Sequence, residues 1–465
     1  MIEHRIEARP GNLVGDLVRW EYNPFSFQAA HRGAANGMST TKDTLNILWI
    51  ADLESRHQMR HGGVLRCVNL SRGLTALGHR VYFLVTNNHN EDLTVRRSFL
   101  DGLRNDDVLT DYFEFDVGRA PRWRAKLARV LVHPLGRNWV MSPTRRRCKA
   151  EVLSLLDQYR IDLCIFSDRY DLFLIPEFAS RAPTLVDWCD SYVLTMLRDI
   201  RVQLRNHRAG PIPAAIKDLI DWFMIERFYG RKSTRNLVAS PADKACLDVI
   251  TGRPRRTYVL PNGVSFPTGD QQRVPKIAGR LIFTGTMSFP PNHQAAMWFI
   301  QRVMPSVEQA RGDVRFVVAG QNPCDELRAA ARQNVIITGL VPDLRQEIAS
   351  SELYVAPLIS GSGFKNKIVE AIASGTFVAA TRMAVESLGE RLQKLLLVAD
   401  SADDLARKIL RYLEDPERFD ERLREAREIV KTEFAWERRV GQLLNVCREV
   451  ISARPGLGAG NAGET

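Results

Sequence analysis

Six short apolar runs recur along the second half of the chain, and their hydrophobic residues are consecutive rather than alternating. Such runs are typical of strands that helices cover on both faces, as in a parallel sheet. The clearest helical segment between them opens at residues 291–292 and carries Ala295, Phe299, Val303 and Val307 on one face. The alternation of predicted strands with helices predicts a Rossmann-like domain. Its predicted strands are RLIFTG (280–285), VRFVVAG (314–320), VIITG (335–339), LYVAP (353–357), FVAAT (377–381) and LLLVAD (395–400).

A second set of apolar runs in the first half predicts another unit of the same class. NILWIA (46–51) leads into a loop that ends in Gly62 and Gly63, and a helix follows with an apolar face from Cys67 to Leu77. The paired glycines are not a GxGxxG fingerprint, so no NAD or FAD site is predicted. A plain turn and a close approach of the backbone to a ligand both remain open. The further predicted strands are GHRVYFLV (78–85), YFEFDV (112–117), LCIFSD (163–168), TLVDW (184–188) and NLVAS (236–240).

The length agrees with two domains, since 465 residues exceed what one hydrophobic core usually organises. Pro, Gly and polar residues cluster in residues 261–279, which predicts a linker. The predicted fold class is α/β, with two facing Rossmann-like domains built on parallel doubly wound sheets. The expected division is an amino-terminal extension (1–43), a first Rossmann-like domain (44–262), a hinge (263–278), a second Rossmann-like domain (279–433), a helix packing back across the interface (434–452) and a flexible tail (453–465).

The stretch GSGFKNKIVEAIASGTFVAAT (361–381) combines a glycine-rich turn, a helix start and a buried strand. It follows a predicted strand, so it lies at the sheet edge where ligands bind in doubly wound folds. A turn that enters a helix brings backbone N–H groups and the positive end of the helix dipole to one point, which favours an anion. Lys365 and Lys367 add cationic donors, and Glu370 lies about one turn beyond Lys367. The pattern predicts a site for phosphate and hydroxyl groups, although an ordinary helix start with solvent-facing lysines shares it.

Several motifs together resemble glycosyltransferase family 4, the retaining transferases with two facing Rossmann-like domains (GT-B type). They are LPNGVS (260–265), FTGTMSFPPNHQAAMWFIQRVMPSV (283–307) and GFKNKIVEAIASGTFVAAT (363–381). Three motifs are similar to the bacterial sugar transferases associated with exosortase and exopolysaccharide clusters. They are GGVLRCVNLSRGLTALGHRV (62–81), VDWCDSY (186–192) and KNKIVEA (365–371). The similarity runs in order from about Asn46 to Cys447.

The resemblance implies retaining transfer of a sugar from a nucleotide-sugar donor to a glycan or lipid-linked glycan, in polysaccharide or exopolysaccharide biosynthesis. Glu370 would hold the ribose hydroxyls and Lys367 the diphosphate, whose growing charge requires a preorganised donor. The implied catalytic residues are Lys367, Gly62 and Gly63, the two glycines facing the reaction centre. The implied donor contacts are Gly285, Asn262, Gly263, Gly361, Ser362, Gly363, Lys365, Asn366, Lys367 and Glu370. The implied acceptor-side residues are Asp187, Asp190 and Arg66. The resemblance also implies that residues 279–433 form the nucleotide-sugar-binding domain and residues 44–262 the acceptor-side domain.

Two positions depart from the family pattern. Many members carry a glutamate where this chain has Ser362, which leaves the donor sugar undefined. Residues 286–292 lack the Arg or Lys that many relatives place against the diphosphate, so Lys365 and Lys367 would carry more of its charge. The resemblance implies no metal or other cofactor.

Two clusters of titratable residues have more than one interpretation. Asp187 and Asp190 follow a predicted strand, and they could contact an acceptor hydroxyl or cap the next helix. His57 and His61 are four residues apart, but no HExxH glutamate lies between them, so zinc is not predicted.

The net charge of +11, from 65 basic and 54 acidic residues, arises almost wholly in one segment. Residues 119–149 contain ten basic residues and no acidic one, interleaved with Trp123, Leu127 and Trp139. A basic helix with tryptophan on an apolar face suits an anionic membrane. A solvated basic surface is the main alternative, and nucleic acid is the least favoured partner. A lipid-carried acceptor favours the membrane.

Other features predict a cytoplasmic protein, peripheral at the inner face of the cell membrane. No run of about 18 apolar residues predicts a spanning helix. Residues 1–43 lack a signal-peptide pattern, and Met38 is an alternative start. Seven cysteines without CxxC spacing indicate a reducing compartment.

A hexosyltransferase-type glycosyltransferase is therefore the predicted function, with two alternatives. A nucleotide-sugar epimerase could use the same fold, and it would isomerise its substrate without an acceptor. A non-catalytic carbohydrate-binding or assembly subunit is conceivable because of Ser362. Such a subunit would need neither Lys367 nor Glu370.

Overall fold

The computed structural model describes residues 44–51, 62–86, 93–115, 151–167, 171–205, 212–266 and 274–453. The interpretations given above for residues 1–43, 119–149 and 454–465, and for His57 and His61, lie outside these ranges.

The amino-terminal half forms a sheet of parallel strands in the order β3-β2-β1-β4-β5-β6-β7. All six apolar runs predicted as strands here belong to it, so a parallel α/β unit is confirmed. The apolar pattern does not predict β7, because it has only three residues and forms by pairing with β6 at the sheet edge. The strands are β1 (Asn46–Ile50), β2 (Arg80–Thr86), β3 (Asp111–Phe115), β4 (Leu163–Phe166), β5 (Thr184–Asp187), β6 (Arg235–Val238) and β7 (Thr257–Val259). The helices are α2 (Gly62–Ala76), α3 (Leu93–Asn105), α7 (Ile175–Phe178), α8 (Tyr192–Arg205), α9 (Ile212–Lys232) and α10 (Pro241–Thr251).

The carboxy-terminal half forms a second parallel sheet in the order β10-β9-β8-β11-β12-β13, again as predicted. The predicted helix with Ala295, Phe299, Val303 and Val307 on one face is interrupted by a π-helical turn, yet all four side chains are fully buried. The strands are β8 (Ile277–Thr284), β9 (Arg315–Ala319), β10 (Val335–Gly339), β11 (Ser351–Ala356), β12 (Phe377–Thr381) and β13 (Leu397–Ala399). The helices are α11 (Pro290–Trp298), α12 (Met304–Ala310), α13 (Asp325–Ala329), α14 (Leu344–Ser350), α15 (Asn366–Ala373), α16 (Arg382–Val385), α17 (Glu390–Leu395), α18 (Ala402–Glu414), α19 (Asp420–Glu433) and α20 (Trp436–Ser452).

The edge strand β10 departs from the predicted pattern of burial on both faces. Its residues alternate between the core and the surface, and Ile336 is 37% exposed. An edge strand pairs on one side only, and β10 pairs only with β9. One face of β10 therefore stays in contact with solvent although its sequence is continuously apolar.

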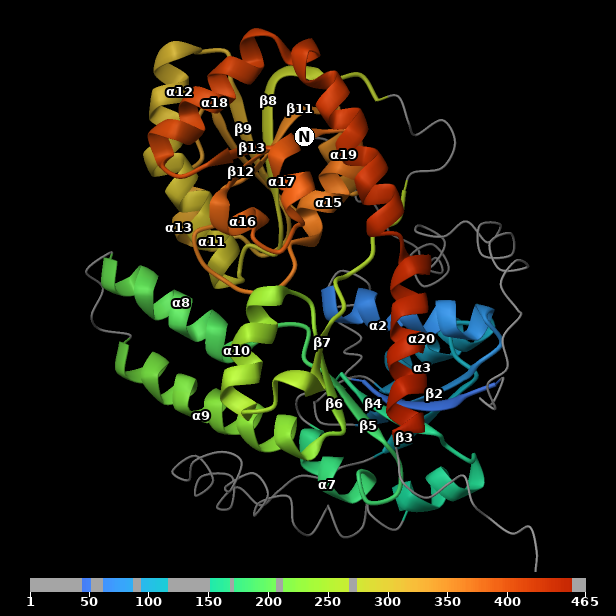
Figure 1. Ribbon diagram of the computed structural model, residues 1–465. Helices are drawn as coiled ribbons and strands as arrows, with labels where there is room; N and C mark the ends of the chain where they lie inside the picture. Colours follow the sequence, from blue (N-terminus) through green and yellow to red (C-terminus); the bar gives the residue numbers. More distant parts are fainter. Residues whose placement is uncertain are drawn as a thin grey trace, which may run out of the picture.

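The strand order of each sheet reverses once, between β1 and β4 and between β8 and β11. Such a switch point opens a crevice outside the carboxyl ends of the strands, where ligands bind in this class of fold. Figure 1 shows the two sheets as separate bodies, one above the other, with α8 and α10 directly below the loops of the upper domain. The fold thus places two crevices opposite each other.

The chain crosses between the domains twice, and the two crossings lie side by side. The backbone N–H of Val264 donates to the carbonyl of Phe434 at 2.8 Å. Beyond this point α20 runs along the amino-terminal domain, away from α19 (Figure 1). Trp436 is seated on Gly263, where a Cβ atom would lie only 2.3 Å from the indole ring. Gly263 thus allows the helix that follows one crossing to pack directly on the other.

Trp436→Ala is expected to lower the free energy of unfolding of the amino-terminal domain by about 3 kcal/mol. The indole is 93% buried in that domain's core, and its loss leaves a cavity under the paired crossings. Urea unfolding measures the effect, with Arg438→Ala, an exposed position on the same helix, as control. Equal stability of the two variants would mean that α20 does not anchor the crossing.

Candidate functional site

A cavity of about 450 Å³ lies between the two domains. The carboxy-terminal domain lines it with the loops that follow β8, β9, β10 and β11, four neighbouring strands. The amino-terminal domain contributes Leu65, in the first turn of α2, and Asp190, which follows β5. The carboxyl edges of both sheets therefore face one space, and the switch point between β8 and β11 lies beside it.

Lys367 projects from the first turn of α15 into this cavity. Its Nζ donates to Asn292 Oδ1 at 2.6 Å and lies 4.6 Å from the centre of the Phe283 ring. Gly285 adjoins the same group, since a Cβ atom there would lie 3.0 Å from Lys367 Nζ. Gly320 packs on Gly285 in turn, with 1.8 Å between an added Cβ and the Gly285 carbonyl oxygen. Two glycines thus bring the β8 and β9 loops close enough to surround the amine.

The charge of Lys367 is sensitive to its surroundings. Desolvation, followed by the nearby charge of Lys365, lowers the pKa of Lys367 to about 7, and Glu370 offsets part of this shift. The amine of Lys367 therefore gains and loses its proton near neutral pH. An anion beside the amine would raise this pKa again, because it favours the charged form.

The loop after β10 and the start of α14 give the cavity an apolar wall beside this polar end. Its residues are Leu340, Val341, Pro342 and Leu344. Arg345 follows them and also lines the cavity. This arginine provides a cation that residues 286–292 lack, and nothing in the local sequence places it there, because the contact depends on the neighbouring position of β9 and β10 in the sheet.

The glycine turn before α15 has the backbone conformation that the sequence predicts. Gly361 and Gly363 have φ angles of 95° and 77°, and an added Cβ on Gly363 would lie 1.8 Å from Asp190 Oδ1. Lys365 is buried and directs its ammonium group back into this turn, where it donates to the carbonyls of Ser362 and Gly363. Lys365 therefore holds the turn together, whereas Lys367 points toward the cavity.

Ser362 faces the opposite domain. Its Oγ lies 2.5 Å from Thr195 Oγ1 and donates to the Ser191 carbonyl at 3.2 Å. Next to it, Arg198 donates to the Gly361 carbonyl at 2.8 Å and forms an ion pair with Glu386. The glycine turn (residues 361–363) is thus fastened to α8.

Asp187 and Arg66, two of the residues expected on the acceptor side, form a buried ion pair. Arg66 Nε donates to Asp187 Oδ2 at 2.7 Å, and both residues are at least 96% buried. Arg66 also donates to Asn262 Oδ1, and Asn262 Nδ2 donates to Asn366 Oδ1 at the start of α15. Of these four hydrogen-bonded residues, only Asn366 lines the cavity. Asp187, Arg66 and Asn262 lie outside the cavity and reach the carboxy-terminal domain through the hydrogen bond to Asn366. Gly263 is covered by Trp436.

Asp190 and the paired glycines are the predicted residues of the amino-terminal domain nearest the cavity. Asp190 lines it directly. Gly62 and Gly63 begin α2, and Leu65 of that first turn lines the cavity. The sequence offers Asp187 and Asp190 as caps for the next helix, but other side chains accept from the N–H groups at the start of α8. Ser191 Oγ accepts from Leu194 N–H, and Glu226 accepts from Tyr192 N–H.

Asp243 supports the glycine turn, and the sequence analysis does not identify it. Its carboxylate accepts from the backbone N–H groups of Gly363 and Ser191 at 3.1 and 2.9 Å, so it joins the two domains at the glycine turn. Burial raises the pKa of this carboxyl group. In the sequence Asp243 is an ordinary acidic residue in the first turn of a helix, and its partners lie 52 and 120 residues away.

Within the described ranges, no group of three or more His, Cys, Asp or Glu side chains is arranged to hold a metal ion. The same part of the chain contains no helix that is long and apolar enough to cross a membrane.

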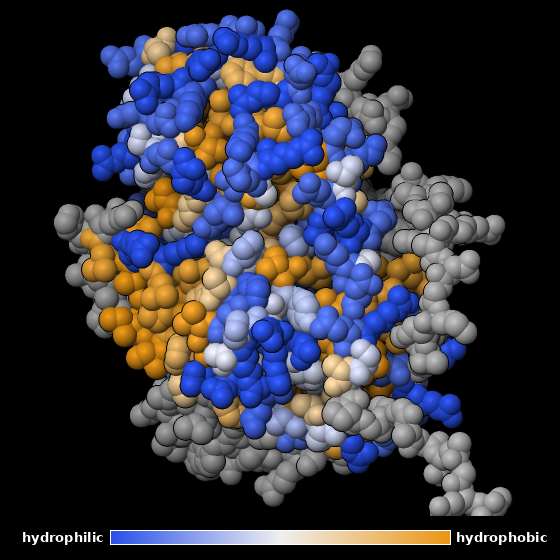
Figure 2. Space-filling view, viewed as in Figure 1, coloured by the Kyte–Doolittle hydropathy of each residue, from blue (hydrophilic) through white to orange (hydrophobic). Residues whose placement is uncertain are grey.

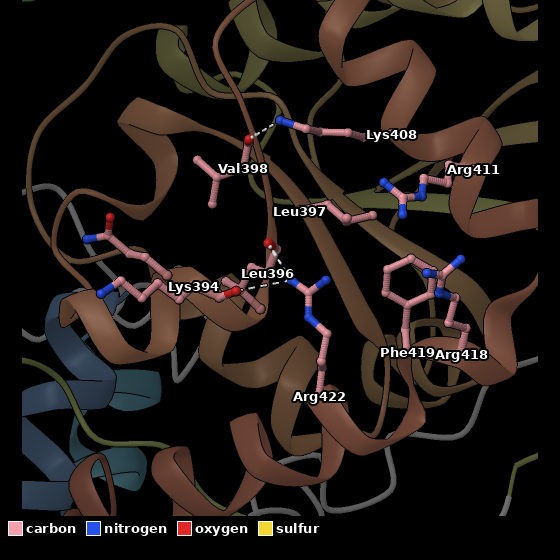
Figure 3. A pocket seen from close by; sticks show the side chains of 10 residues that line it. Lys394, Leu396, Leu397, Val398, Lys408, Arg411, Arg418, Phe419 and Arg422 are labelled. Carbon is pink, nitrogen blue, oxygen red and sulfur yellow. Dashed lines mark hydrogen bonds between the residues drawn. The ribbon is translucent and has the colours of Figure 1, made fainter.

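A second cavity of about 410 Å³ lies at the edge strand β13 (Figure 3). Lys408 Nζ donates to the Val398 carbonyl at 2.6 Å, and Arg422 donates to the carbonyls of Leu395 and Leu396 at 3.0 Å. Lys408 thus occupies a backbone acceptor of the edge strand, which hinders pairing with another strand, and Arg422 binds the last carbonyls at the end of α17. Their role is therefore explained within the fold, and the interdomain cavity is the candidate site.

Residues 278–415 match the family model described as Glycosyl transferases group 1. The chain is 24% identical over 141 residues to an uncharacterized 44.6 kDa protein in the cps region of Klebsiella pneumoniae, which covers 28% of this chain and 36% of that protein. It is 27% identical over 167 residues to a phosphatidyl-myo-inositol mannosyltransferase of Mycolicibacterium smegmatis, covering 34% and 42%. The chain thus spans about two fifths of the length of these curated relatives.

Solved structures resemble the whole described fold at low sequence identity. A glycosyltransferase from Rickettsia africae ESF-5 has a TM-score of 0.62 at 13% identity, covering 89% of this chain and 100% of that one. HepE of Anabaena in complex with UDP has a TM-score of 0.60 at 14% identity, covering 87% and 100%. Sucrose-phosphate synthase of Thermosynechococcus elongatus has a TM-score of 0.61 at 16% identity, covering 88% and 100%. The predicted GT-B type fold is confirmed.

Proposed function

We propose that this protein is a glycosyltransferase that moves a sugar from a nucleotide-sugar donor to a glycan or lipid-linked glycan acceptor. The observation that carries the proposal is the interdomain cavity, in which Lys367, a glycine turn and an apolar wall lie at the carboxyl edge of a parallel sheet. The match of residues 278–415 to Glycosyl transferases group 1 covers the domain that supplies these elements.

The cavity offers a complementary surface for each part of a nucleotide sugar. The apolar wall from Leu340 to Leu344 suits the flat face of a base, and the Glu370 carboxylate can accept hydrogen bonds from ribose hydroxyls. Lys367 and Arg345 provide cations for the diphosphate. HepE of Anabaena, which shares the fold, is in complex with UDP, and this supports a nucleotide at the equivalent domain.

The proposed chemical step is displacement of the nucleoside diphosphate from the anomeric carbon by an acceptor hydroxyl. The bond between that carbon and the phosphate oxygen breaks, and a bond to the acceptor oxygen forms on the same face. Negative charge grows on the departing phosphate oxygen, which takes up the proton of the acceptor hydroxyl. Lys367, once protonated, would stabilise that charge from a fixed position, since Asn292 holds its Nζ at 2.6 Å. Asp190 enters the cavity from the opposite domain, where an acceptor would arrive.

The finer features of the reaction follow from the resemblance to family 4. We propose retention at the anomeric carbon, no requirement for a metal ion, and a role in bacterial exopolysaccharide biosynthesis in the cytoplasm. Activity that survives prior treatment with a chelator would support the metal-independent step, and strict dependence on an added divalent cation would contradict it.

Binding of UDP, GDP and dTDP, measured by calorimetry, tests the proposal. We expect one nucleotide to bind, and Glu370→Ala to weaken it by at least about tenfold through loss of the ribose hydrogen bonds. Glu390→Ala, an exposed carboxylate on α17, serves as the matched control. If none of the three binds, the non-catalytic subunit becomes the better account.

Nucleotide binding is expected to take up a proton near neutral pH. The pKa of Lys367 is about 7 in the free protein, and a bound diphosphate would raise it. Above pH 7 the free protein must gain that proton on binding, so the affinity falls by up to tenfold per pH unit, whereas below pH 7 Lys367 adds no such dependence. Calorimetry in buffers of different ionisation enthalpy measures the uptake. A Lys367→Met variant that retains the same pH slope would assign the proton to another group.

A further inference from the structure

An apolar surface covers the outer side of the helical hairpin formed by α8 and α9. Its large side chains are at least 39% exposed: Leu197, Leu204, Ile216, Ile220 and Phe223. Figure 2 shows the corresponding hydrophobic area over these two helices, at the left of the lower domain. A contiguous apolar patch of this kind marks an interaction surface more often than chance exposure. We call these five residues the hairpin surface.

The hairpin surface is additional to the residues that hold the hairpin together. Tyr192 and Trp222 stack at 4.3 Å between the helices, and Val193, Val202 and Ile225 are buried. On α9 the exposed positions 216, 220 and 223 have the spacing of one helix face, and on α8 positions 197 and 204 are two turns apart. Each helix therefore has two apolar faces, of which one is needed for packing.

The charged residues around the hairpin surface indicate which kind of partner would bind to it. The exposed charged side chains described on α8 and α9 include one carboxylate, Asp218, and the cations Arg201, Lys217, Arg227, Arg231 and Lys232. Lys217 pairs with Asp221, a half-buried neighbour. An apolar centre with a basic margin complements a bilayer that contains anionic lipid. A second copy of the chain would bring like charges together instead.

The same hairpin leads directly to the donor site. Thr195 Oγ1 of α8 lies 2.5 Å from Ser362 Oγ in the glycine turn, and Arg198 donates to the Gly361 carbonyl. Leu204 lies nine residues beyond Thr195, which is about 14 Å along a helix. A molecule anchored in lipid at the hairpin would therefore present its head group near the mouth of the interdomain cavity.

We propose that α8 and α9 dock on an anionic lipid bilayer and that the acceptor is a glycan attached to a lipid in that bilayer. The second part rests on the proposed transferase function, whereas the docking itself does not. The docking orients the cleft toward the membrane, so that an acceptor with an apolar anchor reaches the site and a free glycan gains nothing from the hairpin.

Vesicle flotation of the full chain tests the docking, with phosphatidylcholine vesicles that contain or lack phosphatidylglycerol. We expect the protein to float with the anionic vesicles only. Ile220→Ser combined with Phe223→Ser should lower the bound fraction on the order of tenfold, since both side chains would leave the lipid. Val249→Ser combined with Ile277→Ser removes apolar residues elsewhere that are at least as exposed, and this variant should float like the wild type.

Three results would overturn the proposal. The first is equal flotation of the hairpin variant and its control. The second is binding that disappears only when the cations of residues 119–149 are replaced. The third is self-association that the hairpin variant abolishes, without any lipid binding, which would make the surface an interface between copies of the chain. Calorimetry with UDP, GDP and dTDP on the same proteins separates this outcome from failure of the transferase proposal, because the hairpin variant should retain the nucleotide binding of the wild type.

Discussion

Replacing Lys367 by alanine is expected to lower sugar transfer by at least about a hundredfold while leaving the fold intact. Removing one preorganised hydrogen-bond donor from a developing negative charge has an effect of about this size. We propose this role for Lys367 because Asn292 fixes its Nζ and Gly285 leaves the space beside it open. Arg345 lines the same cavity and retains part of the charge, so ground-state binding should fall less than turnover.

The stability of the same variant distinguishes a functional lysine from a structural one. The folded-state pKa of Lys367 is lowered from 10.5 to about 7, so the unfolded chain binds more protons between these values. Burying this side chain therefore costs stability below about pH 10, and most of all below pH 7. Lys367→Ala should unfold at the same urea concentration as the wild type or higher at pH 7.

Steady-state transfer assays and urea unfolding on the same preparations check both statements. Lys394→Ala, an exposed lysine at the second cavity, is the matched control and should change neither quantity. Wild-type turnover in Lys367→Ala would remove this residue from the mechanism. A large loss of stability together with activity would mean that the lysine supports the fold.

The sequence brings Lys367 and Glu370 of the cavity together because they are close along the chain. Lys367 and Glu370 lie on one short helix, so their spacing along the chain already gives their spacing in the cavity. Arg345 and Asp243 cannot be found in this way. Arg345 reaches the cavity because β10 neighbours β9, and Asp243 meets Gly363 only when the domains come together. Long-range contacts of this kind have no local pattern.

The buried pair of Arg66 and Asp187 shows why an isolated charged residue is hard to interpret from sequence. Both residues lie in motifs that resemble a transferase, and a charged residue after a strand is typical of a site. The structure gives each the other as its partner, and their burial at the back of the cleft follows from that pairing. A lone charge in a motif is ambiguous in sequence, because its partner is 121 residues away.

Replacing Gly320 by alanine is expected to weaken nucleotide binding by at least about a hundredfold. An added Cβ would lie 1.8 Å from the carbonyl oxygen of Gly285 and 2.8 Å from its carbonyl carbon. Both atoms belong to the backbone, so no side chain can rotate to relieve the overlap. The β8 loop must move by roughly 1 Å or more, and Gly285 would leave Lys367. A misplacement of this size costs about a hundredfold where geometry is preorganised.

Gly339→Ala is the matched control for Gly320→Ala. Gly339 ends the adjacent strand β10 with a φ of 67°, and an added Cβ meets no atom within 4 Å. It therefore carries the strain of a left-handed backbone, about 1 kcal/mol, without the overlap. Calorimetry should find near wild-type nucleotide affinity for this control, and urea unfolding should find both variants folded. Equal affinity of the two variants would show that the β8 and β9 loops can separate without harm. The nucleotide would then be bound by α15 alone, without a contribution from the Gly285 loop.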